Sequence, residues 1–104
     1  MSEFKYEILL DIKSRVDQLV VDNGTSKKIL NDMSSFLETR LSQINNLNNV
    51  NQKDFAIQRC SDILLRYAKF QYPNSDIELN RLMEDIIDQL DENNFSVMSM
   101  LKGA

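Results

Sequence analysis

The sequence lacks most of the residues from which enzymes build active sites. It contains no histidine, no tryptophan, one cysteine, one proline and two glycines. Without histidine there is neither a Ser/His/Asp or Cys/His nucleophile system nor a His/Cys zinc site. Two glycines as far apart as Gly24 and Gly103 form neither a phosphate-binding loop nor a dinucleotide fingerprint. We therefore expect a non-enzymatic protein with no cofactor and no bound metal.

Cysteine and long apolar runs are scarce as well. A lone Cys60 cannot form an internal disulfide, and its position in a helical apolar pattern predicts a buried small hydrophobe. The longest uncharged apolar runs, such as Ile8 to Leu10, have three residues, whereas a bilayer span needs about 20. Acidic residues stand near the N-terminus, where a secretory signal is basic. A cytoplasmic protein without a membrane partner is expected.

The sequence does have the apolar periodicity of α-helices. Apolar residues recur three and four positions apart along most of the chain, and no segment alternates as a strand does. Breaks fall at Gly24, in an asparagine-rich stretch between 45 and 51, and at Pro73. Helices are thus predicted over residues 3–21, 26–46, 52–71 and 76–92. The expected fold is all-α, an antiparallel four-helix bundle in one domain spanning residues 1–104. For residues 95–104, a short fifth helix, a frayed tail and a cover over one end of the bundle all stay open.

Local signals predict where the helices begin and which residues they bury. The expected N-caps are Ser2, Thr25 or Ser26, Asn51, and Ser75. The last of these is the clearest, because Glu78 follows three residues later as in a capping box. Gly24 is expected to end the first helix in a left-handed conformation. Periodicity assigns Val20 in the first helix, and Tyr67 and Phe70 in the third, to the core.

Negative charge is concentrated near the C-terminus. From position 76 onward there are seven acidic and two basic residues, a net charge of −5, whereas residues 1–75 have ten basic and nine acidic ones, a net charge of +1. A solvated helix face beside a mildly basic third helix would explain this pattern. An anionic surface that docks onto a basic partner would explain it too.

A protein-protein interaction module is therefore the preferred function, as a small adaptor, inhibitor or assembly factor. Two surfaces are the candidates, an acidic face of the fourth helix and a methionine-rich tail whose apolar residues adapt to varied partners. Their partner-binding residues are Glu84, Asp85, Asp88, Asp91, Glu92, Phe95, Met98, Met100 and Leu101. The partner is another protein, and an exposed tail would also allow a homo-oligomer. The composition is typical of small proteins from AT-rich genomes, phages included.

Three other functions are weaker. A nucleic-acid-binding regulator would use the third helix, where Tyr67, Phe70 and Tyr72 stand among basic residues, but a net charge of −4 and a pI of about 4.7 disfavour it. A nucleic-acid mimic would use the acids of the fourth helix. A helical carboxylate-metal hydrolase is least favoured, because its acids on the fourth helix need inward-facing carboxylates from a second helix. The acids available for it are Glu84, Asp85, Asp88 and Glu92, with Glu3, Glu7 and Asp11 on the first helix.

Overall fold

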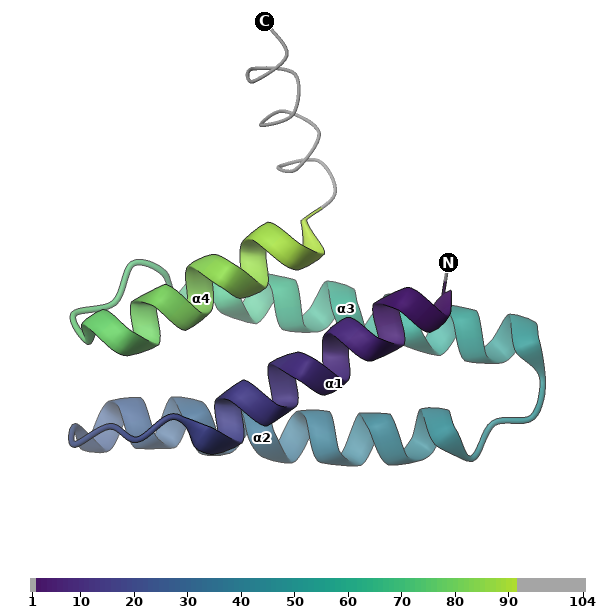
Figure 1. The fold of residues 1–104 in the computed structure, drawn as a ribbon, viewed down its shortest axis with the longest axis horizontal. Helices are drawn as coiled ribbons and strands as arrows, with labels where there is room; N and C mark the ends of the chain where they lie inside the picture. The colour runs from purple at the N-terminus through teal and green to yellow at the C-terminus, as the bar shows by residue number, and fades with distance from the viewer. Residues whose placement is uncertain (1, 92–104) are drawn as a thin grey trace, which may run out of the picture.

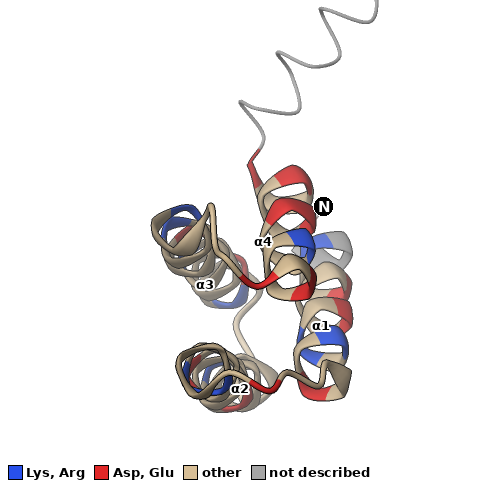
Figure 2. Cartoon of the chain, turned by 90° about the vertical axis from the view of Figure 1, so that its left-hand side faces the viewer, with Lys and Arg blue, Asp and Glu red and all other residues tan. Residues whose placement is uncertain are grey.

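The computed structural model describes residues 2–91, with side chains from Lys5 onward, and these residues fold into four α-helices. The helices are α1 (Ser2–Gln18), α2 (Gly24–Asn45), α3 (Val50–Gln71) and α4 (Ile77–Leu90). Successive helices run in opposite directions (Figure 1). Viewed from the end, α2 and α3 form one layer and α1 and α4 a second (Figure 2). The predicted antiparallel four-helix bundle is confirmed, and residues 2–91 contain no strand. The expected tail over 95–104 lies outside the described residues.

One hydrophobic core joins the four helices. Its largest fully buried side chains are Leu9 and Ile12 of α1, Met33 and Leu37 of α2, Leu64 of α3, and Leu79, Met83 and Ile86 of α4. Within residues 5–91 no phenylalanine or tyrosine is fully buried, so aliphatic side chains and methionine fill the interior. None of the helices in the described part of the chain is long and apolar enough to cross a membrane.

The first connection differs from the expected one. α1 ends at Gln18 and not at Val21. Val21 still packs into the core, whereas Val20 is 80% exposed, so its assignment to the core was wrong. Asn23 caps α2, because its Oδ1 accepts hydrogen bonds from the backbone N–H groups of Thr25 (2.8 Å) and Ser26 (3.2 Å). Gly24 is the first residue of α2 and has no positive φ, so the expected left-handed conformation is wrong.

The other helix starts also shift by one or two residues. α1 already includes Ser2, which was expected to precede it. Asn49 caps α3 by accepting from the N–H of Gln52 at 3.0 Å, in place of Asn51. Asp76 caps α4, in place of Ser75, and its Oδ1 accepts from two backbone N–H groups at 3.1 Å. A carboxylate at this position also complements the positive end of the helix dipole.

The buried face of α3 is rotated from the predicted one. Ile57, Leu64 and Ala68 are buried, Tyr67 is half-buried, and Phe70 is 84% exposed, so the assignment of Phe70 to the core was wrong. Ala68 and Phe70 are two positions apart and so point about 200° away from each other. Because Ala68 faces the core, Phe70 faces solvent.

Candidate protein-binding surface

Two of the acidic residues predicted to bind a partner form ion pairs with neighbouring helices. Asp85 is half-buried and forms an ion pair with Arg15 of α1, with an Oδ2 to Nη2 distance of 2.7 Å. Asp91 follows α4, is largely buried, and pairs with Lys69 of α3 at 2.5 Å. Both carboxylates neutralise cations on neighbouring helices and therefore serve the fold.

The outward-facing acids of α4 are fewer than the sequence suggested. Glu84 and Asp88 are exposed and lie one helical turn apart. Glu84 Oε1 accepts a hydrogen bond from the hydroxyl of Tyr72 at 2.7 Å, and this bond raises the pKa of Tyr72. Figure 2 shows the acidic residues along the outer side of α4. Glu92, Phe95, Met98, Met100 and Leu101 lie outside the described residues.

The described carboxylates do not converge on a metal site. Within residues 5–91, no group of three or more Asp, Glu or Cys side chains could hold a metal ion. Glu7 and Asp11 of α1 border a shallow hollow with Gln89 of α4 and not with Glu84 or Asp88. The juxtaposition that the hydrolase hypothesis required is therefore not present among these residues.

Cys60 is buried, as predicted, with 2% of its surface exposed. Burial raises the pKa of its thiol to about 11, and the opposing effect of Arg40 is smaller. The thiol is therefore protonated at neutral pH and is a poor nucleophile.

The outer face of α3 carries a row of exposed aromatic and cationic side chains. We call Phe55, Arg59, Arg66 and Phe70 the α3 stripe; they are four, seven and four residues apart, which places them along one side of a helix. Phe55 is 68% exposed and Phe70 84% exposed. Arg59 and Arg66 are exposed, and neither forms an ion pair with any residue of the described chain.

Sequence reasoning missed this stripe because it assigned Phe70 to the core and gave Phe55 no role. The four-seven-four spacing was the available signal. It could be interpreted only once Ala68 was known to mark the buried side of α3.

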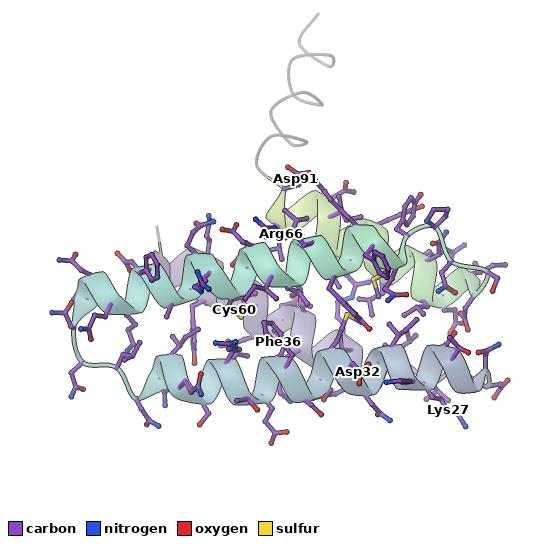
Figure 3. All side chains as sticks on the ribbon, turned by 180° about the vertical axis from the view of Figure 1, so that it is seen from behind. Lys27, Asp32, Phe36, Cys60, Arg66 and Asp91 are labelled. Carbon is purple, nitrogen blue, oxygen red and sulfur yellow. The ribbon has the colours of Figure 1, made fainter. Side chains whose placement is uncertain are left out.

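A second apolar feature lies between α2 and α3. Met33 and Phe36 of α2 face Ile63, Leu64 and Tyr67 of α3 around a hollow of about 200 Å³, with Asp32 at its edge. Figure 3 shows Phe36 and Asp32 along the side of α2 that faces α3. Burial, followed by the nearby charge of Asp32, raises the pKa of Tyr67. The hollow is large enough for one apolar side chain.

Comparisons with known proteins identify no relative: no family model, no curated protein and no solved structure matches this chain.

Proposed function

We propose that this protein is a non-enzymatic protein-protein interaction module, an adaptor, inhibitor or assembly factor, that binds its partner on the α3 stripe. The observation that carries the proposal is that Phe55 and Phe70 stand in solvent on the same helix side as Arg59 and Arg66. Aromatic residues and arginine are the types enriched at the energetic centres of protein interfaces.

The stripe offers both affinity and specificity. Singly exposed apolar side chains are normal on protein surfaces, but here two phenylalanines flank two arginines along one helix. Full burial of each phenylalanine by a partner would contribute about 1.5–3 kcal/mol. The sixteen residues from Phe55 to Phe70 extend about 22 Å along α3, which matches four turns of a partner helix. The partner is therefore expected to present an amphipathic segment with apolar residues for the phenylalanines and acidic residues for the arginines.

The acidic patch of α4 and the C-terminal segment remain part of the proposal. Glu84 and Asp88 form the exposed part of the acidic face. Asp85 and Asp91 form ion pairs that connect this part of the chain to α1 and α3. A nucleic-acid mimic is less well supported, because Asp85 and Asp91 form ion pairs with other helices and leave fewer carboxylates on the exposed face of α4. The buried, protonated thiol of Cys60 is compatible with the cytoplasmic location that we propose.

The test is affinity capture from the native host with matched variants as bait. Wild-type protein is compared with Phe55→Ser/Phe70→Ser, with Arg59→Glu/Arg66→Glu, and with the control Lys28→Glu/Ser35→Glu on the exposed side of α2. We expect the same protein to be captured by wild type and control, and at least tenfold less of it by either stripe variant. Equal capture by all four baits would show that α3 is not the binding surface.

Single-stranded nucleic acid is the second candidate for the same stripe, because exposed phenylalanines and arginines are also what stacks bases and contacts phosphates. The net charge of −4 and the presence of Asp62 between the two arginines argue against it. A mobility shift with a single-stranded oligonucleotide distinguishes the two functions. A shift that weakens with salt and disappears in Arg59→Glu/Arg66→Glu would replace the protein partner with nucleic acid.

A further inference from the structure

An acidic residue lies within the α3 stripe. Asp62 is exposed and stands between Arg59 and Arg66, within one helical turn of each. Its Oδ1 accepts a hydrogen bond of 3.0 Å from Gln58 Nε2, and it forms no ion pair within the described part of the chain. At about 100° per residue, Phe55 and these three charged residues lie within about 60° of the helix circumference. One side of α3 thus carries charges of both signs that no other helix of residues 2–91 neutralises.

This side of α3 points away from the rest of the bundle. Leu64, which is 1% exposed, stands nine positions after Phe55 and therefore lies about 180° around the helix from it. In the end view, none of the other described helices covers the outward side of α3 (Figure 2). A helix of another molecule can therefore lie along α3 without displacing α1, α2 or α4.

The charges of the stripe favour a second α3 helix in the antiparallel orientation. In a parallel two-fold pair each residue lies beside its own copy, so Arg59 would meet Arg59 and Asp62 would meet Asp62. Like charges placed opposite each other disfavour such a pair. In an antiparallel pair with the two-fold axis level with the Cys60–Ser61 bond, Arg59 of each copy lies opposite Asp62 of the other. The surface is therefore complementary to itself in charge.

The same alignment brings Phe55 of each copy opposite Arg66 of the other. A guanidinium group over an aromatic ring is attracted by the negative face of the ring. This chain already forms one such contact, because the guanidinium carbon of Arg40 lies 5.4 Å from the ring centroid of Phe36. Both arginines of the stripe thus gain a partner of suitable chemistry.

A second antiparallel alignment is less favourable. The symmetric spacing of the stripe would also allow Phe55 of each copy to meet Phe70 of the other. Arg59 would then lie opposite Arg66, and these like charges repel. Charge therefore selects the first alignment.

We infer that a second copy of this chain binds the α3 stripe in an antiparallel dimer, in which Arg59 of each copy pairs with Asp62 of the other. The inference rests on the proposed function in taking the stripe as the binding surface, and it names one partner for that surface. One helix from each copy makes a small interface, so the dimer is weak and depends on concentration. A different protein that binds the stripe must compete with the second copy.

Charge reversal tests the pairing. Sedimentation equilibrium of the full chain measures the Kd of the dimer for wild type, Arg59→Asp and Asp62→Arg. We expect each single change to raise the Kd at least tenfold, because it creates two like-charged pairs in the symmetric dimer. The exchange variant Arg59→Asp/Asp62→Arg should restore the wild-type Kd. Lys27→Asp, on the exposed side of α2, is the matched control and should leave the Kd unchanged. Circular dichroism checks that every variant keeps its helices.

A mixture of the two single variants separates contacts between chains from contacts within one chain. Each variant alone should be mainly monomeric at a concentration where wild type dimerises. An equimolar mixture of Arg59→Asp and Asp62→Arg should dimerise with about the wild-type Kd, because every charge at these two positions then faces its opposite on the other chain. No restoration in the mixture would overturn the inference.

Two further results would also overturn it. One is a wild-type chain that stays monomeric up to millimolar concentration. The other is a dimer that Arg59→Asp leaves unchanged or strengthens, since strengthening would place Arg59 opposite Arg66. Neither result would remove the proposed function, because capture of a different host protein through the stripe would still support it.

Discussion

At the scale of single residues, two interhelical ion pairs differ in how much water reaches them. Lys69 and Asp91 have side chains that are 51% and 12% exposed, whereas those of Arg15 and Asp85 are 41% and 46% exposed. Removing the cation lowers the free energy of unfolding substantially only where the remaining carboxylate is shielded from water. We expect Lys69→Met to lower the free energy of unfolding by about 1–2 kcal/mol, and Arg15→Met by less than about 1 kcal/mol.

Urea unfolding near pH 7 measures both values. Lys27→Met, at an exposed position on α2, is the control for removing a surface charge. A Lys69→Met variant as stable as this control would show that the Asp91 carboxylate does not depend on Lys69.

Asp17 links stability to pH. Its carboxylate accepts hydrogen bonds of 2.6 Å from Lys13 Nζ and from Ser34 Oγ, and these bonds lower its pKa below 3.8. A lowered folded-state pKa means that the stabilisation is present above the unfolded-state pKa and is lost as the pH falls through the folded-state pKa. Because the side chain is 40% exposed, we expect a small effect of roughly 0.5 kcal/mol.

The measurement is urea unfolding of wild type and Asp17→Asn at a series of pH values from about 6 down to 2. The variant should be the less stable protein near pH 6, and the difference should shrink below pH 4. A difference that does not change with pH would assign the effect to something other than the charge of Asp17.

The sequence predicted the burial of a residue correctly where the residue type and its own helix determine that burial. Cys60 was placed in the core because a small apolar side chain inside a helical stripe has few alternatives. Phe70 was misplaced because its environment depends on which side of α3 the neighbouring helices cover. Asp85 and Asp91 were placed on an outer face because their cationic partners, Arg15 and Lys69, belong to other helices, and sequence patterns within one helix do not show such contacts.

At the scale of helices, the caps are one residue or more away from where the sequence patterns put them. Asn23 and Asp76 each accept two backbone hydrogen bonds at a helix start. We expect Asn23→Ala and Asp76→Ala each to lower the free energy of unfolding by about 1 kcal/mol. Thr25→Ala and Ser75→Ala, at the positions that the patterns favoured, should each cost less than about 0.5 kcal/mol. Thermal or urea unfolding of the four variants checks the ranking, and the reverse order would show that these helices start as the patterns suggested.

Helix number and type followed from the sequence, because apolar periodicity over 14 to 22 residues is a strong signal. The exact starts did not follow, because several neighbouring Asn, Asp, Ser and Thr residues can each cap a helix. In the loop before α4, Asn80 Oδ1 accepts from the N–H of Asn74 at 2.6 Å and Asn74 Oδ1 accepts from that of Asp76 at 2.9 Å. Hydrogen bonds from side chains before and after the first residue of α4 thus favour Asp76 over Ser75 as its N-cap.

At the scale of the whole molecule, the aromatic residues of the described chain lie outside the fully buried core. The core consists of aliphatic side chains and methionine from all four helices, and the most exposed aromatic residues of the described chain lie on the outside of α3. Such a division allows Phe55 and Phe70 to change with little effect on the fold. It also explains why the sequence predicted the bundle but not the α3 stripe, since the hydrophobic pattern alone does not separate core from interface.

The shared core predicts a single cooperative unfolding transition. Leu9, Leu37, Leu64 and Met83 come from different helices, and each is at most 1% exposed within one continuous cluster. Replacing any one of them with alanine leaves a cavity lined by the other helices, so we expect a loss of about 2–5 kcal/mol in each case. Phe55→Ser/Phe70→Ser should instead change stability by less than about 1 kcal/mol. Because no helix has a core of its own, far-UV circular dichroism and tyrosine fluorescence should report the same urea midpoint for every variant. Two separate midpoints in Met83→Ala would show that α4 unfolds independently of the other three helices.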